Sequence, residues 1–228
     1  MYDIITKKEY FNWFDEDLIE GYTLKHAQDG WIKSLKLDSK EGQKIAEIGG
    51  GNSRILSSMS KNAECWNIDK LEGDGNGPIS HELSEDIKIV KSFMGSFDPN
   101  IPDNYFDSIF SISVMEHIPV DHFPDFYKDC RRILKPNGLM AHAIDIYITD
   151  EPISLAGQNR IESYLKEAEK QGFKLLLSPE INRNITFESR FVSNPDYTMG
   201  TWNGITPSTH RPKREIHQVV SIKLLAHG

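Results

Sequence analysis

The feature that most constrains the fold is a regular alternation that runs from residue 44 to residue 148. Short apolar runs of strand length alternate there with segments whose apolar residues recur at helical spacing. This alternation is typical of βα units, whose parallel strands form a central sheet while the connecting helices cover its faces. Strands are expected at 44–48, 65–69, 87–90, 106–114 and 139–148. The pattern therefore predicts an open α/β sheet.

The second half of the chain continues the alternation. Apolar residues between Phe123 and Leu134 mark the clearest helix, with Asp121 as a candidate cap and Pro136-Asn137-Gly138 as its stop. Another helix is expected before Gly172, followed by strands at 173–177 and 216–225. The predicted order is β-α-β-α-β-β-α-β-α-β-β, which gives a seven-stranded sheet.

Two segments lie outside this alternation. Residues 1–43 carry several aromatic side chains and are expected to form one or two amphipathic helices. Residues 180–214 are poor in aliphatic side chains, and so long an irregular connection favours a lid. We therefore expect a single domain over 1–228, made of an N-terminal helical cap (1–43), a core (44–178), the 180–214 insertion and a last strand (215–226).

Composition excludes several classes of protein. With 26 basic and 34 acidic residues the net charge is −8, which disfavours binding to nucleic acid because phosphate contacts need a basic surface. No apolar run approaches the roughly 20 residues that span a membrane, and the N-terminus does not resemble a secretory signal. Cys65 and Cys130 lie far apart, so we expect no metal site at them and reduced thiols in a cytoplasmic protein.

The most informative stretch is the glycine-rich segment Gly49-Gly50-Gly51, which directly follows the first predicted strand. Glycines at this place allow a tight turn and let a ligand approach the backbone, although they also suit a plain strand-to-helix turn. Arg54 stands where the dinucleotide-binding pattern needs its third glycine, and no Walker A sequence follows. A pyrophosphate ligand is therefore disfavoured.

Two acidic residues suggest a different ligand. Glu47 lies inside the first strand, where a buried carboxylate needs a partner such as a cationic group. Asp69 ends the second strand, where it can accept hydrogen bonds from both hydroxyls of a ribose. A ligand with a ribose, an ammonium group and no phosphate satisfies both, and S-adenosylmethionine is such a molecule.

With these residues the sequence resembles the class I, Rossmann-like S-adenosylmethionine-dependent methyltransferases. The family's first motif, an acidic residue followed by Gly-x-Gly-x-Gly, corresponds to Glu47, Gly49, Gly51 and Ser53, with Ser in place of the last Gly. Residues 106–118 are similar to the family's fourth-strand segment, and 131–138 to its helix-to-strand corner. The resemblance implies helices on both faces of a mostly parallel sheet, with an antiparallel last strand.

The resemblance also implies S-adenosyl-L-methionine as cofactor, S-adenosyl-L-homocysteine as product, and a set of cofactor-binding residues. That set is Glu47, Gly49, Gly50, Gly51, Ser53, Asp69, Ser96 and Ser113. Ser96 is included because it lies in the loop after the third strand, where the family often places an Asp beside the adenine. Asp98 is a weaker candidate for that role.

His117 and Asp145 are the candidate catalytic residues. His117 follows the fourth strand and has a side chain suited to proton transfer near neutral pH, or it braces the cofactor loop together with Glu116. Asp145 lies near the end of the fifth strand. Because side chains alternate along a strand, His142 should face the opposite side, which argues against one metal bound by both.

These observations predict methyl transfer to a small molecule, most simply at oxygen. A small-molecule N-methyltransferase and a non-catalytic cofactor-binding partner protein are the alternatives. Five basic residues in 180–214 (Arg183, Arg190, Arg211, Lys213 and Arg214) would attract an anionic acceptor if the segment is a lid, or belong to a solvated loop if it is not. Neither the acceptor nor the oligomeric state follows from the sequence.

Overall fold

The structure, a computed structural model, describes residue 5 and residues 24–73, 78–149, 155–177 and 217–228. Its centre is a seven-stranded sheet in the order β3-β2-β1-β4-β5-β7-β6. The strands are β1 (Gln43–Ile48), β2 (Ala63–Ile68), β3 (Ile87–Val90), β4 (Phe106–Ile112), β5 (Leu134–Thr149), β6 (Lys174–Leu177) and β7 (His217–His227). All the strand pairs are parallel except β5–β7 and β6–β7, so the predicted Rossmann-like sheet with an antiparallel last strand is confirmed.

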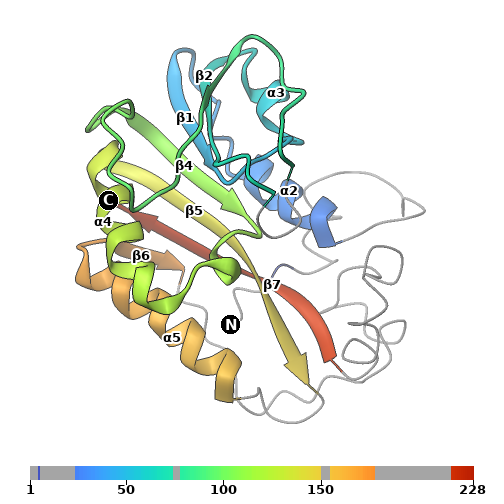
Figure 1. Cartoon of the computed structure of the whole chain (residues 1–228), viewed down its shortest axis with the longest axis vertical. Coiled ribbons are helices and arrows are strands. Elements are labelled where there is room, and N and C mark those ends of the chain that lie inside the picture. Colours follow the sequence, from blue (N-terminus) through green and yellow to red (C-terminus); the bar gives the residue numbers. More distant parts are fainter. Residues whose placement is uncertain (1–4, 6–23, 74–77, 150–154, 178–216) are drawn as a thin grey trace.

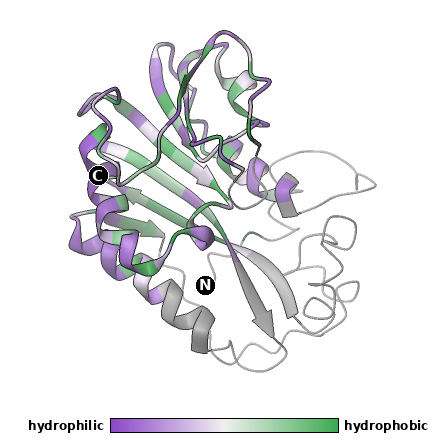
Figure 2. Ribbon diagram, in the orientation of Figure 1, coloured by the Kyte–Doolittle hydropathy of each residue, from purple (hydrophilic) through white to green (hydrophobic). Residues whose placement is uncertain are grey.

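Helices cover both faces of this sheet (Figure 1). α4 (Phe123–Ile133) and α5 (Leu155–Lys170) lie on one face, and α2 (Leu24–Ser34) and α3 (Leu56–Met59) on the other. Each face has its own apolar core, one packed against α4 and α5 and one against α2 and α3. Figure 2 shows the apolar residues concentrated on the strands and the hydrophilic ones on the outer helices and loops. None of the helices in the described part of the chain has the length and apolar character needed to cross a membrane.

Local structure differs from expectation around α4. Asp121 does not cap this helix; it lies in a single 3₁₀ turn, Val120–His122, and no side chain caps the start of α4. The helix also ends earlier than expected, at Ile133, and β5 begins directly afterwards. Pro136-Asn137-Gly138 therefore lies in the irregular first part of β5, where Asn137 has a φ of +62° and the register with β4 shifts.

One predicted helix is missing from the described residues. The segments 69–73 and 78–86, which connect β2 to β3, contain no helix and run as turns and extended chain. About half of the predicted cap and the whole 180–214 insertion lie outside the described residues, as do all the aromatic residues of 1–43 except Trp31. The division of the chain into cap, core, insertion and last strand therefore stays a prediction.

Candidate functional site

The glycine-rich turn joins the end of β1 to α3 at the carboxyl edge of the sheet. Gly49 and Gly51 have φ values of +66° and +50°, a conformation that side chains with a Cβ rarely adopt. The Gly49 N–H donates to the Ile68 carbonyl at 2.8 Å, which fastens the turn to β2. A Cβ on Gly49 would lie 2.6 Å from a Val114 methyl carbon, so the glycine is required by space as well.

Gly50 brings the backbone against two polar side chains of the neighbouring strands. A Cβ there would lie 2.6 Å from Asn67 Oδ1 and 2.8 Å from Glu47 Cδ. Asn67 Nδ2 in turn donates to the Gly51 carbonyl at 2.8 Å. The turn therefore lies directly on the polar ends of β1 and β2, and a larger residue at position 50 would push it away.

Glu47 is buried beneath this turn, with only 4% of the residue exposed. Its Oε2 has no hydrogen-bond partner among the described residues. Burial raises the pKa of the carboxyl to about 7, although Ser53 and the charge of Arg54 oppose the rise. A buried carboxylate with an unpartnered oxygen is costly to keep, and a cationic group of a ligand would supply the missing contact.

Asp69 follows β2 and holds the turn from the other side. Its Oδ2 accepts a hydrogen bond from the Gly51 N–H at 2.9 Å, and its Oδ1 accepts one from the Leu71 N–H at 2.6 Å. Each carboxylate oxygen has more than one lone pair, and Asp69 is only partly buried, so two hydroxyl groups can still bind to it. These residues fit a nucleoside that carries a cationic tail.

Two of the three serines predicted to bind the cofactor, Ser53 and Ser96, have other contacts. Ser53 Oγ accepts from the Leu56 N–H at 3.0 Å, and this bond holds the start of α3. Ser96 is exposed, and its Oγ donates to the Phe93 carbonyl at 2.7 Å and lies 3.0 Å from Ser92 Oγ. Within the described residues, Ser96 thus contacts its own loop rather than the glycine-rich turn.

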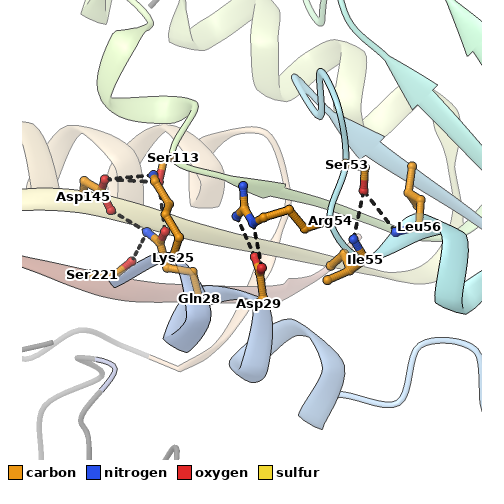
Figure 3. A network of polar contacts seen from close by, with 10 residues as sticks. All are labelled: Lys25, Gln28, Asp29, Ser53, Arg54, Ile55, Leu56, Ser113, Asp145 and Ser221. Atoms are coloured by element: carbon orange, nitrogen blue, oxygen red, sulfur yellow. Dashed lines mark hydrogen bonds and ion pairs between the residues drawn. The ribbon is translucent and has the colours of Figure 1, made fainter. Parts of the chain in front are cut away.

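A second polar cluster lies where β4 and β5 meet α2 (Figure 3). Ser113 and Asp145 bond to each other at 3.1 Å, and both contact the Lys25 ammonium group, which is 3.4 Å from Asp145 Oδ2. Gln28 bonds to Asp145 through its amide nitrogen and also donates to Ser221 Oγ at 2.9 Å. Both Asp145 oxygens are therefore engaged, so this carboxylate anchors α2 to the strand ends.

Ser113 is strained at this position. Its φ of +55° is unfavourable for a residue with a side chain and costs on the order of 1–3 kcal/mol. The Ser113 N–H donates to the Ala143 carbonyl at 2.9 Å, which keeps the chain against β5 as β4 ends. Backbone strain of this kind is concentrated at functional sites.

His117 lies in a short 3₁₀ helix after β4, Met115–His117, and its side chain is 58% exposed. Its Nε2 is 3.9 Å from Glu116 Oε1. The other oxygen of Glu116, Oε2, is buried and has no partner among the described residues. Burial and the neighbouring Asp145 raise the pKa of the Glu116 carboxyl well above its ordinary value, while Lys25 opposes the rise.

The polar face of α2 was not predicted from the sequence. Lys25, Gln28 and Asp29 lie at i, i+3 and i+4, so they share one face of the helix; Lys25 and Gln28 contact Asp145 of β5, and Asp29 contacts Arg54. Asp29 forms two hydrogen bonds with Arg54, at 2.7 and 2.6 Å, and thereby ties α2 to the glycine-rich turn. The spacing was visible in the sequence, but a polar helix face usually points to solvent.

Part of the chain is similar to a known protein family. Residues 46–142, from β1 to the middle of β5, match the model of the family described as "methyltransferase domain". Among curated proteins, none matches this chain in sequence.

Several solved structures share the fold. Geranyl diphosphate C-methyltransferase from Streptomyces coelicolor A3(2), solved with S-adenosyl-L-homocysteine, is 8% identical, with a TM-score of 0.56 over 97% of both chains. The [4+2]-cyclase SpnF is 11% identical, with a TM-score of 0.53 over 89% of this chain and 82% of that one. A Listeria monocytogenes protein assigned to the S-adenosylmethionine-dependent methyltransferases is 12% identical, with a TM-score of 0.52 over 90% and 99%. At these identities the likeness establishes the fold.

Proposed function

We propose that this chain, which belongs to the class I S-adenosylmethionine-dependent methyltransferases, methylates an oxygen atom of a small-molecule acceptor. S-adenosyl-L-methionine is the methyl donor and S-adenosyl-L-homocysteine the product. The observation that carries the choice of a small acceptor over a nucleic acid is a group of acidic residues at the carboxyl edge of the sheet: Glu47, Asp69, Glu116 and Asp145.

On this proposal the glycine-rich turn and its two acidic residues hold the cofactor. Asp69 would accept hydrogen bonds from the ribose hydroxyls, and Glu47 would face the ammonium group. Gly49, Gly50 and Gly51 let the nucleoside approach the backbone, while Ser53 orders the turn. Ser113 and Ser96 would border the cofactor at the ends of β4 and β3.

When bound, the cofactor supplies a methyl group that its positive sulfur already activates. The chain must therefore hold the acceptor oxygen in line with that methyl group, an effect that can contribute about 7–11 kcal/mol. As the C–O bond forms and the C–S bond breaks, the hydroxyl proton must leave the oxygen. A residue that accepts this proton would add roughly 10²–10⁴-fold to the rate.

His117 is our proposed proton acceptor. The exposure of His117 lets the proton that it accepts pass to water. Asp145, which bonds to Ser113 and to two side chains of α2, would fix the shape of the acceptor site.

Charge favours a small acceptor over a nucleic acid. The carboxylates at the strand ends would repel a polyanion, as would the net charge of −8. An anionic small acceptor would need the basic residues of 180–214, which lie outside the described residues. Cys65 and Cys130 are buried and unpaired, which supports the expected cytoplasmic location.

The same carboxylates also favour a second candidate, methylation of an amine. Glu116 Oε2, which is without a partner among the described residues, could accept a hydrogen bond from an amine. An amine must lose its proton before it attacks, so the same base would serve both reactions.

Incubating the protein with a protein-free metabolite extract, a short RNA and methyl-labelled cofactor tests the proposal. Mass spectrometry of the labelled products identifies the methylated atom. We expect label on a hydroxyl oxygen of a small molecule, and less of it with His117→Ala. Label only on nitrogen would favour the amine candidate, and label only on the RNA would contradict a small acceptor.

A further inference from the structure

The charges of Asp29 and Glu47 act on Arg54 more strongly than that of Asp145, and the structure shows which of these two residues Arg54 binds. Its Nε and Nη2 donate to Asp29 Oδ2 and Oδ1 at 2.7 and 2.6 Å, a two-pronged ion pair. The Asp29 side chain is only 12% exposed, so the carboxylate end of this pair is shielded from solvent, whereas the Arg54 side chain is 50% exposed. The guanidinium group is therefore held toward α2 (Figure 3).

Glu47 is the acidic residue that Arg54 does not bind. Although the positive charge of Arg54 lowers the pKa of the Glu47 carboxyl, Oε2 of Glu47 has no hydrogen-bond partner among the described residues. An arginine whose charge acts on a buried carboxylate can form a direct ion pair with it. Here Arg54 is oriented toward Asp29 instead, and the Glu47 oxygen has no partner among the described residues.

The helix that carries Asp29 is fixed in place. Its neighbour Gln28 bonds to Asp145 and to Ser221, which belong to β5 and β7. Trp31, one turn further along α2, is 3% exposed and packs in the core on this face of the sheet. The Asp29 carboxylate therefore has a defined position from which to hold the guanidinium group.

We propose that Asp29 is a positioning residue for cofactor binding, because it holds the Arg54 guanidinium away from Glu47 and keeps that carboxylate free for the ammonium group of the cofactor. This inference rests on the proposed role of Glu47. Without Asp29, Arg54 turns to Glu47, neutralises it and competes with the ligand. Arg54 itself is not needed for the contact between Glu47 and the cofactor.

Binding measurements on single and double variants test this inference without turnover. Isothermal titration with S-adenosylmethionine and with adenosine, which has no ammonium group, is carried out on wild type, Asp29→Asn, Arg54→Gln and the double variant. We expect Asp29→Asn to weaken S-adenosylmethionine binding at least tenfold, since a charge-assisted hydrogen bond is worth about a factor of ten to a hundred. Adenosine binding should change less than twofold.

The double variant gives the decisive result. Removing Arg54 as well removes the competitor, so Asp29→Asn/Arg54→Gln should regain S-adenosylmethionine affinity to within about threefold of wild type. Asp103→Asn, which removes a carboxylate from the exposed ion pair with Arg132, is the matched control and should bind normally.

Two outcomes would overturn the inference: unchanged S-adenosylmethionine binding in Asp29→Asn, or a double variant as weak as Asp29→Asn alone. The second outcome would mean that Asp29 only maintains the local structure. Glu47→Gln separates this failure from that of the underlying assignment. If Glu47→Gln binds S-adenosylmethionine as tightly as wild type, the role of Glu47 is wrong, and the inference about Asp29 fails with it.

Discussion

His142 and Asp145 lie on opposite faces of β5, as expected for residues three positions apart on a strand. The buried imidazole of His142 bonds through Nδ1 to Ser111 Oγ at 2.7 Å and packs against Phe126 of α4. Asp145 instead contacts Lys25 and Gln28 of α2 on the other face. The predicted alternation along this strand is confirmed. The His142 side chain belongs to the core, and the Asp145 side chain belongs to the polar cluster with Lys25 and Gln28.

The buried imidazole makes stability depend on pH. Burial lowers the pKa of His142 from 6.5 to about 3, so the unfolded chain binds the proton more readily and this contribution to stability is lost as pH falls from 6.5 to 3. Urea unfolding of wild type and His142→Asn at pH 7 and 5 measures it. Between pH 7 and pH 5, the free energy of unfolding of the variant should rise by about 2 kcal/mol relative to that of wild type. An equal difference at both pH values would contradict the assignment. Only the difference between the two proteins is informative, because ionisation of Glu47 makes the stability of both depend on pH in the opposite direction.

Cofactor affinity should depend on the ionisation of Glu47. Because burial raises the pKa of this carboxyl to about 7, the ionised form that attracts an ammonium group is lost as pH falls through that value. S-adenosylmethionine binding to wild type should weaken by up to about tenfold per pH unit between pH 6.5 and 5. Glu47→Gln should bind weakly with little dependence on pH. Titration calorimetry over this range checks the prediction, and equal pH profiles for the two proteins would refute it.

Asp69→Ala should weaken S-adenosyl-L-homocysteine binding by about tenfold to a hundredfold. The substitution leaves the Gly51 and Leu71 N–H groups without their acceptor and removes the proposed ribose contact. A thermal-shift titration measures the loss. Asp86→Ala, which removes an exposed carboxylate just before β3, is the control and should bind normally. Normal binding by Asp69→Ala would show that the ribose lies elsewhere.

His117→Ala should slow methyl transfer on the order of a hundredfold or more without changing cofactor affinity. The expected cause is loss of the group that accepts the hydroxyl proton. Single-turnover rates together with S-adenosyl-L-homocysteine titrations separate the two quantities. His122 is another exposed histidine, at the end of the 3₁₀ turn Val120–His122, and His122→Ala should keep full activity. If His117→Ala reduces only affinity, the histidine braces the cofactor loop instead.

Gly50→Ala should weaken cofactor binding through crowding. The new methyl group would approach Asn67 Oδ1 at 2.6 Å and Glu47 Cδ at 2.8 Å, so the turn must move. Gly172→Ala is an informative comparison, because it has open space around the Cβ but a φ of +86°. It should cost about 1 kcal/mol of stability and no affinity. Thermal melts with and without S-adenosyl-L-homocysteine test both variants, and equal loss of affinity in the two would contradict this explanation.

Sequence patterns predicted the sheet well because the short apolar runs that mark strands are a local property of the sequence. Ile87–Val90 has the predicted bounds, and β1, β2 and β4 differ from theirs by two residues or fewer at either end. Prediction failed where neighbours decide the local structure. Asp is a residue type that often caps helices, but Asp121 lies in a 3₁₀ turn before α4. β5 begins five residues before its predicted start because Leu134 pairs with Phe106 of β4.

The order of strands and glycines along the chain determined the fold class, the position of the glycine-rich turn and the positions of the acidic residues at the ends of β1 and β2. These features follow from short-range periodicity and from backbone conformations that only certain residues adopt. Only the tertiary structure decided that Arg54 points toward Asp29 and that Asp145 anchors α2. It also left Glu47 Oε2 without a hydrogen-bond partner among the described residues. Contacts between positions 29 and 54, or 28 and 145, form only when helix and sheet pack together, and no local pattern in a single sequence encodes them.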